Sequence, residues 1–180
     1  DVVGDDAYAQ ATFNVTSGGT LRDATPSPLP SNPNSTAPDA SAPRVLPVRM
    51  QGGAMRWLAE ADTNEGLRSG RDLAGDGVFW ALNDFAGRPT DPLATLDRDE
   101  PVRLDFVNDT RWPHAMHLHG HHFFELDEKG APGDFRDTTL VQPGQSRSVL
   151  FTARNPGDWL LHCHMLGHHA AGMGTWLRVV

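Results

Sequence analysis

Short apolar runs, several of them alternating with polar positions, recur along the last two thirds of the 180-residue chain. Turn-rich segments such as QPGQ and NPGD separate these runs. Many short strands at such spacing predict an all-β sandwich or a Greek-key barrel. No segment has the length and periodicity of a convincing helix, and no run approaches the ~18 apolar residues that span a membrane. The expected strands include residues 78–82, 102–107, 123–126, 148–152, 158–163 and 175–180.

The first 43 residues have a different composition. Residues 21–43 are rich in Pro, Ser, Asn and Ala, too polar and too often interrupted by proline to form a core, and this predicts an exposed linker. Before it, residues 7–15 alternate weakly and could form a strand, although a lone strand cannot fold by itself. The alternative is that residues 1–43 are a disordered tail. Residues 44–180 are expected to form the folded domain.

All nine histidines lie in two clusters, HAMHLHGHH at 114–122 and HCHMLGHH at 162–169, and the second cluster contains the only cysteine. Side chains alternate between the two faces of a strand. His162 and His164 would therefore share one face, as would His117 and His119. Cys163 and His114 would point to the opposite faces of their strands. Two adjacent strands with this pattern would carry two metal sites back to back.

The spacing C-x4-H-x4-M lets one tight loop bring His168 and Met173 back to the metal that Cys163 binds. Together with His114 this gives one cysteine, two histidines and a methionine, the ligand set of a blue-copper electron-transfer centre. Zinc is the competing metal, but zinc sites rarely use methionine and usually combine two or more cysteines. The four histidines on the other face favour copper that binds dioxygen.

These two segments resemble the motifs of the multicopper oxidases. HAMHLHG (114–120) is similar to their H-x-x-H-x-H-G motif, and HCHMLGHHAAGM (162–173) to their H-C-H-x3-H-x4-M motif. The resemblance implies a cupredoxin-like Greek-key β-sandwich or barrel, namely the C-terminal cupredoxin domain of such an oxidase, over residues 44–180. Residues 1–20 would then hold the terminal strand of a preceding cupredoxin domain.

The resemblance also implies the ligands of each copper ion. The type-1 copper would be bound by His114, Cys163, His168 and Met173, the type-2 copper by His117, and the type-3 pair by His119, His162 and His164. Two positions depart from the family pattern. Pro113 precedes the first histidine of the motif, where many members have a proline after it. Gly167 occupies the place of an acidic residue that assists proton delivery in some bacterial relatives.

The family's trinuclear cluster uses eight histidines, and this chain supplies four of them. The resemblance therefore implies a second chain or an N-terminal fragment that carries the other four, as in a cleaved precursor or a truncated oxidase. A complete enzyme would hold four copper ions. His121, His122 and His169 fit neither ligand set and are expected to be supporting or surface residues. Trp112, Trp159 and Trp176 flank the motifs and could either shield the copper ions or fill the core.

The implied function is that of a laccase-like oxidoreductase. It would oxidise phenols or aromatic amines one electron at a time at the type-1 copper, with Cys163, His162, His164 and His168 carrying the electron transfer, and would reduce O2 to water. The alternatives are a metal-oxidising or copper-tolerance oxidase and an electron-transfer-only cupredoxin. A net charge of −8 argues against a nucleic-acid partner. We expect a periplasmic or secreted protein with no membrane association.

Overall fold

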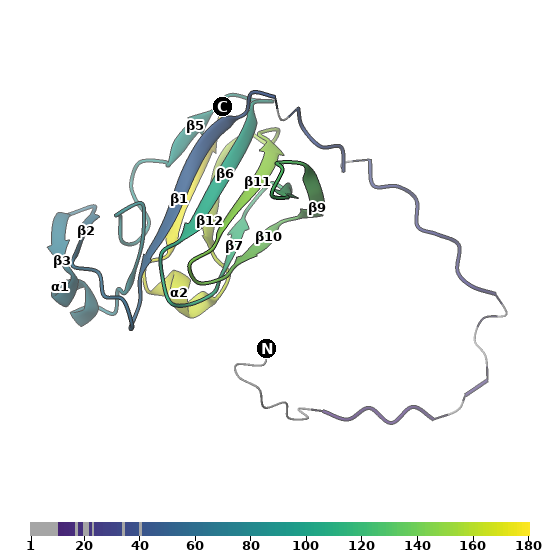
Figure 1. Ribbon diagram of the computed structural model, residues 1–180, viewed down its shortest axis with the longest axis horizontal. Coiled ribbons are helices and arrows are strands. Elements are labelled where there is room, and N and C mark those ends of the chain that lie inside the picture. Colours follow the sequence, from purple (N-terminus) through teal and green to yellow (C-terminus); the bar gives the residue numbers. More distant parts are fainter. Residues whose placement is uncertain (1–10, 17, 20–21, 23, 34, 40) are drawn as a thin grey trace. The chain divides into compact units, whose positions relative to one another are not determined.

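The computed structural model describes residues 11–16, 18–19, 22, 24–33, 35–39 and 41–180 (Figure 1). The chain divides into two units, residues 1–32 and residues 33–180. The described residues of the first unit form no helix or strand. Of the strand expected at 7–15, residues 7–10 lie outside the described residues. The expectation of a terminal strand from a preceding domain stays a prediction.

The second unit is a sandwich of two β-sheets (Figure 1). The larger sheet has six strands in the order β4-β1-β6-β11-β8-β9, and the smaller has five in the order β10-β7-β12-β13-β5. The larger contains β1 (Arg44–Gly52), β4 (Trp80–Leu82), β6 (Pro101–Asn108), β8 (Phe123–Leu126), β9 (Pro132–Arg136) and β11 (Ser146–Thr152). The smaller contains β5 (Ala94–Leu96), β7 (His114–Leu118), β10 (Thr138–Val141), β12 (Gly157–Cys163) and β13 (Gly174–Val179).

The all-β prediction is confirmed, and each of the six expected strands overlaps an observed one. The run at 78–82 forms a strand only from Trp80, and the backbone N–H groups of Phe79 and Trp80 both donate to the carbonyl of Ala171. The strand β1 begins at Arg44, directly after the predicted linker. Its pairing with β6 and that of β5 with β13 are parallel, whereas the remaining pairs within the two large sheets are antiparallel.

Helix is confined to two short segments among the described residues, α1 (Gly70–Gly75) and α2 (Leu166–Ala170). The helix α1 follows the hairpin of β2 (Glu60–Thr63) and β3 (Gly66–Ser69), and this part has its own small apolar cluster. The helix α2 follows β12 and lies at one end of the sandwich (Figure 1). Neither helix, nor any other in the described part of the chain, is long and apolar enough to cross a membrane.

The alternating pattern of the central strands builds the core between the sheets. In β6 every second side chain is buried, ending in Phe106 and Asn108, and in β7 the buried positions are His114, Met116 and Leu118. A histidine thus occupies a position where a strand of this sandwich would ordinarily carry an apolar residue. The end of the core between β7 and β12 is therefore where a polar site lies inside the fold.

Candidate metal centre

The register of β7 and β12 determines which side chains of the two motifs share a face. His162 lies opposite His117, and Cys163 lies opposite Met116. Directly opposed residues of an antiparallel pair point to the same side of the sheet. His117 and His162 therefore share one face, while Cys163 shares the inner face with Met116 and, two residues earlier, His114. This arrangement follows the alternation read from the sequence.

On the inner face, three donor atoms converge at the end of the core. The Nδ1 atoms of His114 and His168 are 3.2 Å apart, and each is 3.7 Å from Sγ of Cys163. Within the described residues, these three side chains are the group whose donor atoms are close enough to bind one metal ion. His114 and Cys163 are completely buried, and His168 is half-buried.

Met173 is held at this group by backbone hydrogen bonds. Its N–H donates to the carbonyl of His168 at 3.0 Å, and its carbonyl accepts from the N–H of Cys163 at 3.2 Å. The Met173 side chain is completely buried in the same apolar cluster as Cys163. The short helix α2 thus closes a loop that returns both His168 and Met173 to Cys163.

A tryptophan that the sequence reasoning missed forms a wall of this group. The Trp80 ring lies 4.9 Å from the His114 ring and 4.7 Å from the His168 ring. The three tryptophans suggested from the motifs lie differently. Trp159 packs on His121, Trp176 donates to the carbonyl of Pro89, and Trp112 is 40% exposed. Trp80 is 34 positions before His114 in the chain, so no local pattern could have indicated it.

On the other face, the four remaining histidines of the two motifs come together. The His117 ring lies 4.7 Å from that of His119, 5.7 Å from that of His162 and 5.1 Å from that of His164. The Nε2 atoms of His119 and His162 approach to 3.1 Å. His162 is buried and His117 is partly buried, whereas His119 and His164 are exposed, so this set of imidazoles reaches the surface of the chain through His119 and His164.

Backbone carbonyls fix the tautomers of two of these rings. Nδ1 of His117 lies 2.9 Å from the carbonyl of Asp137, and Nδ1 of His162 lies 2.9 Å from the carbonyl of Cys163. Because a carbonyl can only accept, each Nδ1 carries the hydrogen, and each Nε2 keeps its lone pair. Such outer hydrogen bonds are typical of metal-binding histidines.

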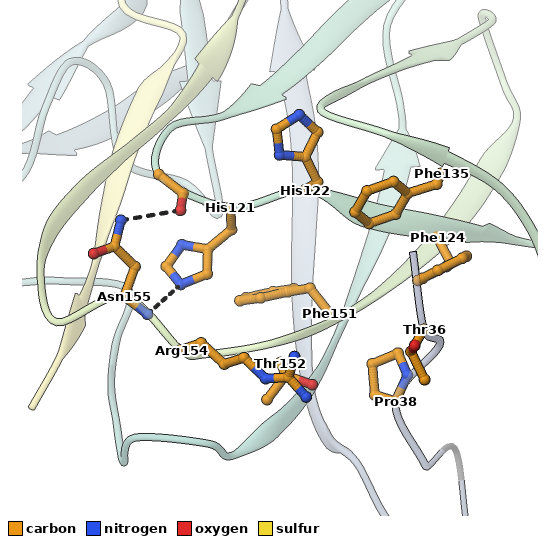
Figure 2. A pocket seen from close by; sticks show the side chains of 11 residues that line it. Thr36, Pro38, His121, His122, Phe124, Phe135, Phe151, Thr152, Arg154 and Asn155 are labelled. Carbon is orange, nitrogen blue, oxygen red and sulfur yellow. Dashed lines mark hydrogen bonds between the residues drawn. The ribbon is translucent and has the colours of Figure 1, made fainter. Parts of the chain in front are cut away.

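The three other histidines contribute differently. Figure 2 shows His121 and His122 at a separate cavity of about 230 Å³, where Nε2 of His121 accepts from the Asn155 N–H. His122 stacks on Phe135. His169 lies closer to the surface histidines, with its ring 4.5 Å from that of His162. The expectation that all three are supporting residues stays a prediction.

A sequence model of the multicopper oxidases matches residues 61–180, two thirds of the chain. The chain belongs to the multicopper oxidase family. The prediction made from the two motifs is thereby confirmed, and the observed sandwich is the cupredoxin-like domain of such an oxidase. Multicopper oxidases are copper-dependent oxidoreductases that use O2.

Three relatives illustrate the similarity. The chain is 40% identical over 101 residues to multicopper oxidase MmcO of Mycobacterium tuberculosis, covering 56% of this chain and 20% of that protein. It is 38% identical over 100 residues to a copper resistance protein A homolog of Pseudomonas syringae pv. tomato, covering 56% and 17%. The crystal structure of Lac15 from a marine microbial metagenome matches with a TM-score of 0.58 and 33% identity over 90% of this chain and 33% of that one. The chain thus spans about a fifth of the length of these curated relatives.

Burial sets the protonation of both donor sets in this multicopper oxidase chain. It lowers the pKa of His114 from 6.5 to about 3, with a further contribution from His168, and lowers that of His162 to about 4. Burial also lowers the pKa of His119 and His168 and raises that of the Cys163 thiol. Neutral imidazole is the form that binds metal, and a metal must displace the thiol proton. The donor set fits copper, because a buried, uncharged group of two imidazoles and a thiol offers soft ligands without preformed ion pairs.

The low histidine pKa values predict how the metal-free chain responds to acid. Between pH 6.5 and pH 3, His114 binds a proton in the unfolded chain but not in the folded chain. The free energy of unfolding therefore has its full contribution from His114 above pH 6.5 and decreases as the pH falls through this range. For His114 alone the slope reaches about 1.4 kcal/mol per pH unit. Urea unfolding of the metal-free protein at several pH values measures it. The variant His114→Gln should have a shallower slope, and an unchanged slope would contradict this assignment.

Proposed function

We propose that this chain is the copper-binding C-terminal part of a laccase-like oxidase, which oxidises phenols or aromatic amines and reduces O2 to water. The observation that carries the proposal is the presence of two donor sets on opposite faces of one pair of strands. Cys163 belongs to the inner set, and its neighbours in the chain, His162 and His164, belong to the surface set. Such an arrangement suits a protein that passes electrons between two metal sites.

The proposed ligands follow from these positions. His114, Cys163, His168 and Met173 would hold a type-1 copper, His117 a type-2 copper, and His119, His162 and His164 the type-3 pair. Copper bound at these sites supplies one-electron redox cycling and reactivity toward dioxygen. Four one-electron oxidations of the reductant balance the reduction of one O2, with four protons, to two molecules of water.

The chain's own residues provide the route for the electrons. His168 lies on α2 and is half-buried, so its ring edge is the part of the inner set nearest to a reductant in solution. Trp80 packs against His114 and His168 and excludes water from that side. The backbone from Cys163 to its two neighbouring histidines gives a short covalent path to the other face.

The surface around His168 supports an aromatic reductant. Leu166 on α2 is 69% exposed, and the exposed Phe79 belongs to the segment that bonds to Ala171 at the end of the same helix. Apolar side chains at this position favour contact with an aromatic ring over a hydrated metal ion.

The similarity to a copper resistance protein A homolog favours the second candidate, a metal-oxidising or copper-tolerance oxidase. Comparing kcat/KM for a methoxyphenol with that for Cu(I) in the assembled protein distinguishes the two candidates.

The surface histidines support a partner. The four imidazoles on this face are half of the eight-histidine cluster of the family, and two of them, His119 and His164, are exposed in this chain. A second chain or an N-terminal fragment would supply the other half. Native mass spectrometry of the purified protein tests this. A mass well above 19.6 kDa with about four copper ions per chain would support the proposal. A single 19.6 kDa species with one copper ion would support the electron-transfer-only cupredoxin instead.

We further propose a periplasmic or secreted location, the compartment favoured from the sequence.

Replacing Met173 with leucine should raise the reduction potential of the type-1 copper. A thioether donates electron density and stabilises the oxidised ion, whereas leucine fills a similar volume without donating. Spectroelectrochemical titration of the blue absorption band measures the change, and Met116→Leu, on the same inner face, serves as the control. An unchanged or lower potential in Met173→Leu would rule out Met173 as the axial ligand.

A further inference from the structure

The second ring nitrogen of His114 points away from the metal-binding group into a closed polar network. Nε2 of His114 lies 2.9 Å from Oγ1 of Thr110, and both residues are buried. Thr110 lies in the loop between β6 and β7, and its hydroxyl is in turn 2.7 Å from Oδ1 of Asn108 at the end of β6. The network therefore connects the inner donor set with the neighbouring sheet.

The hydrogen bonds of Asn108 leave no freedom in its orientation. Its amide NH2 donates to the carbonyls of Trp112 at 2.7 Å and Val141 at 3.0 Å. Its Oδ1 accepts from the backbone N–H of Thr110 at 3.0 Å as well as from the Thr110 hydroxyl. Because both amide hydrogens have carbonyl acceptors, the opposite orientation of the amide would place a carbonyl oxygen against two others.

These contacts also account for every hydrogen-bonding position of the Thr110 hydroxyl. A hydroxyl has one hydrogen and two lone pairs. The hydrogen faces two oxygens that can only accept, Asn108 Oδ1 at 2.7 Å and the Trp112 carbonyl at 3.1 Å, and one lone pair accepts from the backbone N–H of Trp112 at 3.2 Å. The remaining lone pair faces Nε2 of His114, so that nitrogen must carry the hydrogen. Nδ1 of His114 is then the atom with the free lone pair, and it is the atom that faces Cys163 and His168.

We propose that Thr110, oriented by Asn108, is a positioning residue that holds His114 in the tautomer and ring orientation needed for metal binding through Nδ1. This inference rests on the proposed copper site and adds two residues to it that neither motif contains. Outer hydrogen bonds of this kind fix the tautomer of a metal-binding histidine and raise its basicity, and their loss costs about 10- to 100-fold in metal affinity. The Trp80 wall limits tilting of the same ring, while Thr110 determines which nitrogen faces the metal.

The tautomer can be tested without mutation and without metal. Long-range ¹H–¹⁵N correlation spectra of the metal-free 180-residue chain at neutral pH distinguish a histidine protonated at Nε2 from one protonated at Nδ1. We expect His114 to carry its hydrogen on Nε2 alone. A hydrogen on Nδ1, or an average of both tautomers, would overturn the proposal.

Variants test the consequence for binding, with Co²⁺ as a probe that does not change its oxidation state. Thr110→Val removes the hydroxyl with little change of shape and should weaken Co²⁺ affinity, read from the sulfur-to-cobalt charge-transfer band, about 10- to 100-fold. Thr110→Ser keeps the hydroxyl and should restore affinity to within a few-fold. The control Thr139→Val removes another buried hydroxyl of the same sheet, which donates to Glu125 and not to a member of the donor set.

The possible outcomes distinguish a failure of the Thr110 proposal from a failure of the proposed copper site. Absence of the charge-transfer band in the unmodified chain would contradict the inner metal site, whereas the tautomer measurement does not depend on metal. Equal loss of affinity in Thr110→Val and Thr139→Val would show that Thr110 acts through general packing and would overturn the positioning role. If Thr110→Val does not fold, the tautomer of the unmodified chain and the affinity of Thr110→Ser still decide.

Discussion

Replacing Cys163 with serine should abolish copper binding at the proposed inner site and, with it, the intense blue absorption expected of a type-1 copper. The hydroxyl of serine is a hard donor that does not ionise near neutral pH, whereas the thiolate is the soft ligand on which the blue copper site depends. The proposed ligand set would lose its thiolate and keep two imidazoles and the thioether of Met173, and the expected loss is one copper ion per chain. Metal analysis together with the visible spectrum measures both quantities.

Two properties of the chain make this experiment simple to read. Cys163 is the only cysteine, so no other thiol can replace it or form a disulfide. Serine is only slightly smaller than cysteine, so the substitution leaves a small cavity at this buried position and should not disrupt the fold. His122→Ala, which changes an exposed histidine of the first cluster, should keep both copper and colour. Retention of the blue band in Cys163→Ser would refute the assignment of the inner site.

The parts of this site that the sequence predicted are those that depend on local geometry. The alternation of side chains along two strands separates His117 and His162 from His114 and Cys163, and the pairing of β7 with β12 then brings the two motifs into register. The C-x4-H-x4-M spacing likewise determines that α2 returns His168 and Met173 to Cys163. The alternation within each strand and the loop from Cys163 to Met173 follow from chain geometry over ten residues or fewer, whereas the pairing of β7 with β12 joins residues 45 positions apart, such as His117 and His162.

The parts that could not be predicted depend on contacts between distant segments. Trp80 meets His114 and His168 because the loop before β4 bonds to Ala171, a long-range contact without a local signal. Thr110 and Asn108 precede the first motif closely, yet both are residue types that ordinarily form turns. Their role emerges only from the folded loop that aims the Thr110 hydroxyl at Nε2 of His114.

The second large effect concerns the surface histidines. In the chain assembled with the proposed part that carries the other cluster histidines, His119→Gln should reduce O2 consumption to less than about one per cent, because oxygen reduction at the proposed cluster would require all of its metal ions. The inner donor set does not include His119, whose Nε2 lies 3.1 Å from that of His162 on the opposite face. The blue band should therefore remain.

Stopped-flow spectroscopy makes the separation of the two sites measurable. A phenolic reductant should bleach the blue band of His119→Gln at nearly the unmodified rate, since the proposed entry point for electrons, His168, belongs to the inner donor set beside Cys163. Return of the colour on mixing with O2 should then be lost, because the electron has reached Cys163 and has no competent acceptor beyond it. The same treatment of His122→Gln, a histidine of the same cluster that stacks on Phe135, should leave both phases unchanged. If His119→Gln regained its colour in O2 as fast as the unmodified protein, the surface histidines would have no part in oxygen reduction, and the electron-transfer-only function would be favoured.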